Sequence, residues 1–421
     1  MEIQIILTIA IALIVFAAVS RRLTESLISA PMVFLAVGLL IGPLGFDIVV
    51  PPDGHLIKLI AELTLVLVLF SDAVGIDLKV VCKERGLPIR LLTIGMPLCI
   101  GFGALAGLLT FPEIFFWEAA ILAVILAPTD AALGQAVMTN PNLPQRIRQA
   151  LNIESGLNDG VALPLIFMML AIACGTAGIV PDDYEGQPWV YWSQFLALQL
   201  IAAPVIGLAI GWLGGLILSN AQRRAWSNDK LLGLAMVGIA LLAFSAAELL
   251  HSSGLIASFV AGLVVGTRER AIAHQLHDFT EAEGQILTLL TFMLFGAVLF
   301  PSSLQHITWA TLGYALLSLT LVRMIPVIIA CMGNGLKIQT TLFMGWFGPR
   351  GLASILLILL VVQQSELRHI DQITAAAMLT VVLSIILHGL SAASLSRRYS
   401  NWVSAGCSQS TSELEDSRAS H

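Results

Sequence analysis

Long apolar runs constrain the fold of this chain more than any other feature. Over its 421 residues, mostly apolar segments of about 17 or more residues recur along nearly the whole length. Each is long enough to cross the hydrocarbon core of a bilayer as a helix. Only 11% of the residues are charged, whereas a soluble domain carries about 25%. The chain is therefore predicted to be an all-α polytopic membrane protein.

We predict about thirteen transmembrane helices, with ends placed to within about three residues. The eighth and ninth are separated only by His251-Ser252-Ser253, so their division is the least certain. The predicted spans are 3–20, 28–48, 56–78, 88–111, 115–139, 148–174, 191–218, 231–250, 252–267, 284–301, 307–333, 339–363 and 371–394.

The distribution of positive charge predicts the orientation. Most of the 21 Lys and Arg residues fall in loops on one side, and the loops on the other side carry only Lys58 and Arg368. Cytoplasmic loops are enriched in Lys and Arg, so we expect the N-terminus outside and the C-terminus inside a cell (inner) membrane. Arg21 and Arg22 follow the first apolar run instead of preceding it, which favours an uncleaved helix over a signal peptide.

Several function classes are disfavoured. The five cysteines are scattered, with no CxxC pair, and indicate neither a metal site nor a disulfide framework. There is no basic patch for nucleic acid and no phosphate-binding loop, and we expect no cofactor. The segment after Arg398 is short and rich in Ser and Glu, which is typical of a disordered tail.

Charged residues near the middle of the predicted spans are candidates for function, because a charge there costs several kcal/mol. They cluster in Ala127-Pro128-Thr129-Asp130, in Glu154-Ser155-Gly156-Leu157-Asn158-Asp159-Gly160, at Arg323 and in Gly348-Pro349-Arg350-Gly351. A single Asn or Ser within a span would be explained more simply by a hydrogen bond to a neighbouring helix than by a functional role. Two carboxylates within six residues favour a functional site.

The sixth span presents oxygen ligands on adjacent faces. Ser155 and Asp159 are four residues apart, and Glu154 and Asn158 form a second such pair. Carboxylate, hydroxyl and amide oxygens are the hard ligands that a small alkali cation needs once it loses its water. We therefore expect a monovalent cation, Na⁺, Li⁺ or K⁺, to bind here, and the ligand types alone do not rank these three ions.

Pro128 and Pro349 predict two broken helices. Proline removes a backbone donor and frees a carbonyl one turn earlier, and discontinuous helices recur at transporter binding sites. An ordinary proline kink is the alternative, but the neighbouring Asp130 and Arg350 favour a break. Seven spans separate the two prolines, which fits two inverted six-helix repeats around a linking seventh helix.

Arg323 needs a carboxylate partner inside the protein, because it stays protonated and lies too deep to reach either surface. Glu154 is our choice, since it lies at a similar depth and leaves Asp159 for the ion. Asp72 or backbone carbonyls at a helix break remain the alternatives, and Asp72 could instead line a path.

At these motifs the sequence resembles the sodium/proton exchanger family, in its bacterial NhaP-type branch, over nearly the whole chain. The resemblance implies a thirteen-helix homodimer that exchanges a monovalent cation for H⁺. Asp159 would be shared by cation and proton, with Thr129, Asp130, Glu154 and Ser155 lining the site and Asn158 holding Glu154. In this family Asn before the key Asp usually accompanies electroneutral exchange.

The resemblance also divides the chain into a moving core and a scaffold. It predicts scaffold or dimer helices in 1–85 and 176–301, core helices in 86–175 and 302–395, and a short disordered cytoplasmic tail in 396–421. A cation-coupled solute symporter is the rival within transport, although few polar residues remain for a second pocket. An intramembrane enzyme is a rival of another class, but no His-Glu-x-x-His zinc motif is present.

Overall fold

The computed structural model describes residues 7–8, 10–18, 28–47, 54–76, 86–138, 140–178, 186–226, 232–268, 286–364 and 367–406. Within these ranges all regular structure is helical, with no strand, as the composition predicted. Both ends of the predicted first span and residues 407–421 of the predicted tail lie outside the described residues.

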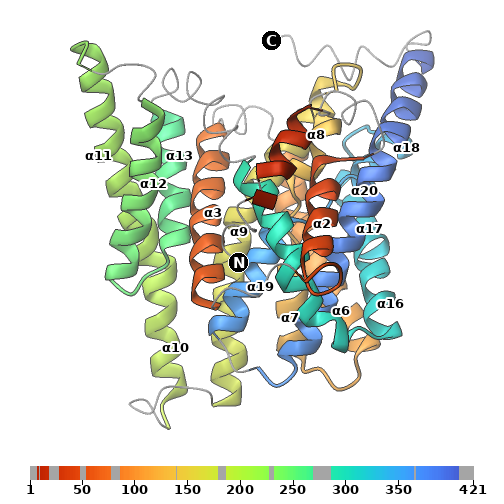
Figure 1. Cartoon of the computed structure of the whole chain (residues 1–421), viewed down its shortest axis with the longest axis horizontal. Coiled ribbons are helices and arrows are strands. Elements are labelled where there is room, and N and C mark those ends of the chain that lie inside the picture. The colour runs from red at the N-terminus through yellow and green to blue at the C-terminus, as the bar shows by residue number, and fades with distance from the viewer. Residues whose placement is uncertain are drawn as a thin grey trace.

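The helices stand roughly side by side, and the last described helix runs to the upper right edge of the bundle at its C-terminal end (Figure 1). Seven of those described are long and apolar enough to cross a membrane, and several shorter apolar helices accompany them. In chain order the described helices, long and short together, are α2 (Ala30–Ile41), α3 (Gly54–Gly75), α5, η1 and α6 (together Leu87–Thr110), α7 (Phe116–Ile125), α8 (Ala131–Met138), α9 (Gln145–Ala177), α10, η3 and α11 (together Pro188–Arg223), α12 (Leu232–Leu249), α13 (Gly254–Arg268), the helical stretch Ile286–His306, α16 (Trp309–Leu319), α17 (Leu321–Cys331), α18 (Ile338–Trp346), α19 (Leu352–Gln364) and α20 (Ile370–Gly406).

One group of helices packs through glycine. Helix α13 lies between α3 and α11, and all three run close together on one side of the molecule (Figure 1). A Cβ atom at Gly207 would overlap the carbonyl oxygen of Ala257, and one at Gly266 would overlap that of Val74. Small residues allow such close backbone approach between membrane helices, where packing replaces the hydrophobic effect as the source of association. The division of 231–267 into two helices at His251 is confirmed.

The second group contains both broken helices. Helix α7 ends at Ile125 and α8 begins at Ala131, while α18 ends at Trp346 and α19 begins at Leu352. The intervening segments 126–130 and 347–351 are not helical, so the breaks predicted at Pro128 and Pro349 are confirmed. A third interruption, at Thr320 between α16 and α17, was not predicted.

The predicted disorder after residue 395 is wrong for residues 396–406, because α20 continues to Gly406. Tyr399 stacks on Phe343 of α18 with ring centroids 4.3 Å apart, and its hydroxyl donates to Thr340 Oγ1 at 2.9 Å. Trp402 stacks beyond it on Tyr399. These aromatic side chains pack the end of α20 against α18. The prediction of disorder rested on the Ser-rich and Glu-rich composition of the residues that follow, and it was extended too far toward the N-terminus.

The close contact of α13 with α3 generates a prediction about stability. We expect Gly266→Ala to lower thermal stability in detergent by about 1–3 kcal/mol, because the added methyl group would overlap the Val74 backbone. Gly238→Ala in α12 is the matched control, since nothing lies within 4 Å of its Cβ position. An unchanged melting temperature for Gly266→Ala would show that this contact is looser than described.

Candidate functional site

The site is built around the crossing of the two helix breaks. The backbone N–H of Asp130, in the first break, donates to the carbonyl oxygen of Pro349, in the second, at 2.8 Å. Ser354 Oγ of α19 also donates to the carbonyl oxygen of Ile125, at the end of α7, at 2.8 Å. Residues more than 200 positions apart in the sequence are thereby bonded directly where both helices lose their own hydrogen bonds.

The Asp130 carboxylate caps two helices at once. Its Oδ1 accepts from the backbone N–H of Leu133 in α8 at 3.2 Å, and its Oδ2 accepts from that of Leu352 in α19 at 2.6 Å. An anion is stabilised at the positive end of a helix dipole, and here two such ends converge on one side chain. Gly351 makes room for it, because a Cβ there would overlap Asp130 Oδ2. Cation binding by Asp130 stays a prediction.

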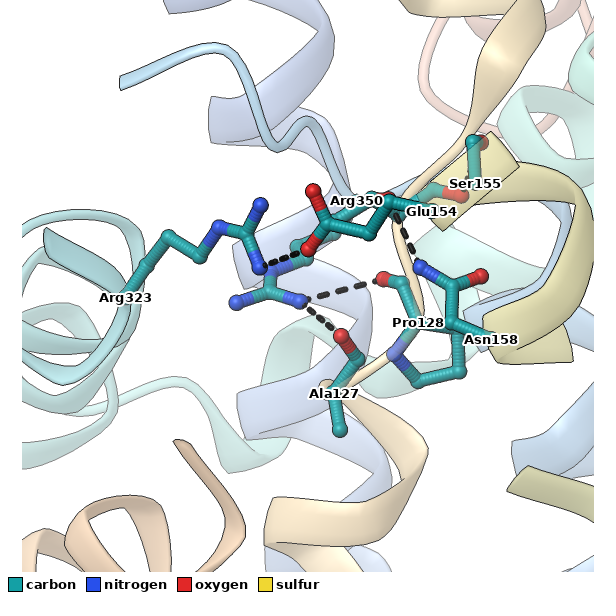
Figure 2. A network of polar contacts seen from close by, with 8 residues as sticks. Ala127, Pro128, Glu154, Ser155, Asn158, Arg323 and Arg350 are labelled. Atoms are coloured by element: carbon teal, nitrogen blue, oxygen red, sulfur yellow. Dashed lines mark hydrogen bonds and ion pairs between the residues drawn. The ribbon is translucent and has the colours of Figure 1, made fainter. Parts of the chain in front are cut away.

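Arg350 supplies the opposite charge at the carbonyl end of α7. Its guanidinium donates to the carbonyl oxygens of Ala127 and, at 3.1 Å, Pro128, which follow the last turn of α7 (Figure 2). A cation is favoured at the negative end of a helix. The side chain is 1% exposed, so this charge is held inside the crossing and does not reach solvent.

Helix α9 holds Thr129 from the other side. Ser155 Oγ donates to the Thr129 carbonyl oxygen at 2.6 Å, and Asn158 Nδ2 donates to Thr129 Oγ1 at 2.7 Å. The resemblance implied that Asn158 would hold Glu154, but the structure gives its amide this other partner. Thr129, Ser155 and Asn158 are therefore joined by hydrogen bonds, and cation binding by Thr129 and Ser155 stays a prediction.

Glu154 and Arg323 form the predicted ion pair. Arg323 Nη1 lies 2.6 Å from Glu154 Oε1, with side-chain exposures of 3% and 4% for the arginine and the glutamate (Figure 2). Arg323 stands in the first turn of α17, directly after the interruption at Thr320. The choice of Glu154 over Asp72 is confirmed, and the pair links α9 to α17.

Three buried oxygen atoms on α9 have no hydrogen-bond partner: Glu154 Oε2, Asn158 Oδ1 and Asp159 Oδ1. Buried polar atoms are nearly always bonded, so unpartnered oxygens on one helix segment are the atoms available to a ligand. Among the described residues no group of three His, Cys, Asp or Glu side chains is arranged to hold a metal ion. A cation here would need mixed amide, hydroxyl, carbonyl and carboxylate ligands.

Asp72 joins this region from α3, the helix that packs on α13. Its carboxylate lies near enough to those of Asp130 and Asp159 for the charges to interact. The sequence left the role of Asp72 open between lining a path and pairing with Arg323. Asp72, Asp130 and Asp159 therefore form an acidic region, which lies where the helix group α3, α11 and α13 meets the crossing of the two breaks.

The chain matches, over residues 6–398, the family described as "Sodium/hydrogen exchanger, transmembrane". Its fold matches the sodium proton antiporter MjNhaP1 from Methanocaldococcus jannaschii, with a TM-score of 0.73 and 21% sequence identity. That match covers 94% of this chain and 99% of the other.

The curated relatives that this chain is similar to are named for two different cations. The K(+)/H(+) antiporter NhaP2 from Shewanella sp. (strain MR-4) is 23% identical over 82% of this chain and 58% of the relative. The Na(+)/H(+) antiporter from Schizosaccharomyces pombe is 25% identical over 58% of this chain and 54% of the relative. The chain thus spans a little over half the length of these two curated relatives.

A double-mutant cycle tests the buried ion pair. Arg323→Gln and Glu154→Gln should each lower thermal stability in detergent, by about 3–5 kcal/mol, because each strands an uncompensated buried charge. The double variant should lose much less than the sum of the two. Losses that simply add would contradict the pairing and direct the cycle to Asp72.

Proposed function

This chain belongs to the sodium/hydrogen exchanger family, and we propose that it exchanges a monovalent cation for H⁺ across the membrane. The observation that carries the proposal is the set of unpartnered buried oxygens on α9, beside a crossing whose own charges are already compensated. Na⁺ is the first candidate and K⁺ or Li⁺ the alternatives, since the relatives are named for both sodium and potassium.

Asp159 is the carboxylate at which cation and proton compete. Both oxygens of Asp130 accept backbone hydrogen bonds, and Glu154 has committed one oxygen to Arg323. Asp159 Oδ1 is buried without a partner. Asp159 therefore retains the acceptor capacity that a proton or a dehydrated cation would use, with Glu154 Oε2, Ser155 and Thr129 completing the cation ligands.

Exchange then follows from the requirement that the Asp159 carboxylate is occupied by either a proton or a cation when the core moves. An ionised carboxylate inside a membrane is costly, and either a proton or a cation neutralises it. If the loaded core moves between the two sides and the empty, charged core does not, inward movement of one ion requires outward movement of the other. By the family resemblance the moving core is 86–175 with 302–395, and 1–85 with 176–301 is the scaffold of a homodimer.

Asp72 extends the proposal toward the access path. It lies on α3, which packs on α13 in the proposed scaffold, whereas Asp159 lies on the proposed core. A carboxylate facing the site across that boundary would attract a cation electrostatically before it reaches Asp159. We place the protein in the cell (inner) membrane, with the N-terminus outside and the C-terminus cytoplasmic.

A cation-coupled symporter is the second candidate and an intramembrane enzyme the third. A symporter would need an organic substrate site, and the polar groups at the crossing are committed to one another. A family of exchangers argues against an enzyme. Proton flux without added solute would favour exchange over both.

Removing the Asp159 charge should abolish exchange while the protein still folds. We expect Asp159→Asn to show no cation-dependent proton movement in everted vesicles, with Na⁺, K⁺ and Li⁺ added in turn. Glu113→Gln makes the same change at an exposed loop position and should behave as wild type. Robust proton movement in well-expressed Asp159→Asn vesicles would place the exchange site elsewhere.

Transport should generate no net current, because Asn158 is neutral and leaves Asp159 as the carboxylate that changes occupancy. Proteoliposomes given an imposed sodium gradient should acidify or alkalinise without developing a membrane potential, as reported by a voltage-sensitive dye. A sustained potential that depends on the gradient would contradict one-for-one exchange.

A further inference from the structure

His388 lies in the middle of α20 with 1% of its surface exposed, and neither the ion pair nor the cation ligands use it. Its Nε2 lies 2.9 Å from the carbonyl oxygen of Trp346, the last residue of α18. One turn earlier on the same helix, Ser384 Oγ accepts from the backbone N–H of Arg350 at 2.6 Å. The two side chains thus contact both ends of the second helix break.

We propose that Ser384 and His388 are positioning residues, a bracket that holds the broken segment 347–351 near both of its ends and thereby fixes the crossing beside the cation site. The proposal rests on the proposed exchange function. It concerns neither a cation ligand nor a proton carrier.

The protonation of His388 follows from its partners. A carbonyl oxygen only accepts, so the proton must be on Nε2 for the bond to Trp346 to form. Nδ1 lies 3.2 Å from Ser384 Oγ and 3.0 Å from the Ser384 carbonyl oxygen. A neutral ring accepts the serine hydroxyl at Nδ1, and a doubly protonated ring donates to the carbonyl instead. In both states Nε2 holds Trp346.

The two contacts of Ser384 and His388 are linked to the cation site through one backbone hydrogen bond. Between these two contacts lies Pro349, whose carbonyl oxygen accepts from the Asp130 N–H. Asp130 follows Thr129, which α9 holds through Ser155 and Asn158. A shift of the second break therefore moves Thr129 relative to α9, and with it the geometry around Asp159.

The first break is held in the same manner. In each half of the bundle, the long helix that follows a broken pair supplies two polar side chains about one turn apart. Helix α9 supplies Ser155 and Asn158, which bind Thr129, and α20 supplies Ser384 and His388. Because both breaks lie in the membrane, their freed backbone groups need such internal partners.

The test compares His388→Leu, His388→Gln and Ser384→Ala in proteoliposomes, measuring KM for the cation, kcat and the pH profile. Leucine removes both contacts of the ring, and we expect KM to rise about tenfold with a smaller change in kcat, because buried backbone groups lose their partner. Glutamine keeps an N–H donor for Trp346 and should stay within about twofold of wild type. Its pH profile should match that of wild type.

Ser391→Ala is the matched control. Ser391 Oγ accepts from Trp346 Nε1 at 2.9 Å, so the variant removes a bond to the same tryptophan from the same helix without touching the backbone of the break. Its KM should remain that of wild type. If His388→Leu does not fold, Ser384→Ala and His388→Gln carry the comparison.

Hydrogen–deuterium exchange of the segment 347–352 tests the bracket without relying on transport. Exchange should be faster in Ser384→Ala than in Ser391→Ala, whether or not the wild type moves cations. Equal exchange in these two variants, or a wild-type KM in folded Ser384→Ala or His388→Leu, would overturn the proposal. A pH profile displaced in His388→Gln would assign the histidine to proton binding instead. A wild type without cation-dependent proton flux would refute the exchange function while leaving the bracket standing on the exchange data.

Discussion

The structure depends on satisfying the backbone of two helices that are interrupted inside a membrane. Each interruption leaves N–H and C=O groups without intrahelical partners, and lipid offers no replacement. The protein solves this by crossing the two breaks, so that the Asp130 N–H donates to the Pro349 carbonyl oxygen and the two charged side chains compensate three converging helix ends. Asp130 serves the positive ends of α8 and α19, while Arg350 serves the carbonyls that follow α7.

Because of this compensation, the charges that hold the helices together are different from the charge that can still bind a ligand. Asp130, Arg350 and the Glu154–Arg323 pair are all buried, and each charge meets a partner of opposite sign or a helix end. Asp159 stands beside them with an oxygen that bonds nothing. Under the proposed function, this oxygen can take up or release a ligand without breaking the hydrogen bonds that hold the crossing.

Further side chains that hold the crossing come from helices that are not themselves broken. Helix α9 reaches Thr129, and α20 reaches both ends of the second break and then continues to Gly406, where Tyr399 packs against α18. Long uninterrupted helices provide the rigid support that short half-helices lack. In the other helix group, close glycine contacts join α13 to α3 and α11. Asp72 of α3 lies near enough to Asp159 for their charges to interact.

The sequence by itself determined the helical class, most of the spans, both breaks and the Glu154–Arg323 pair. Apolar length, proline and the cost of a buried charge are local properties, and each restricts its neighbourhood strongly. Only the tertiary structure decided that Asp130 caps α19, that Asn158 bonds Thr129, that His388 holds Trp346 and that α20 extends past residue 395. The physical reason is that a hydrogen bond joins whichever groups the packing brings within about 3 Å, and most of these partners lie many turns or a whole repeat apart in the chain.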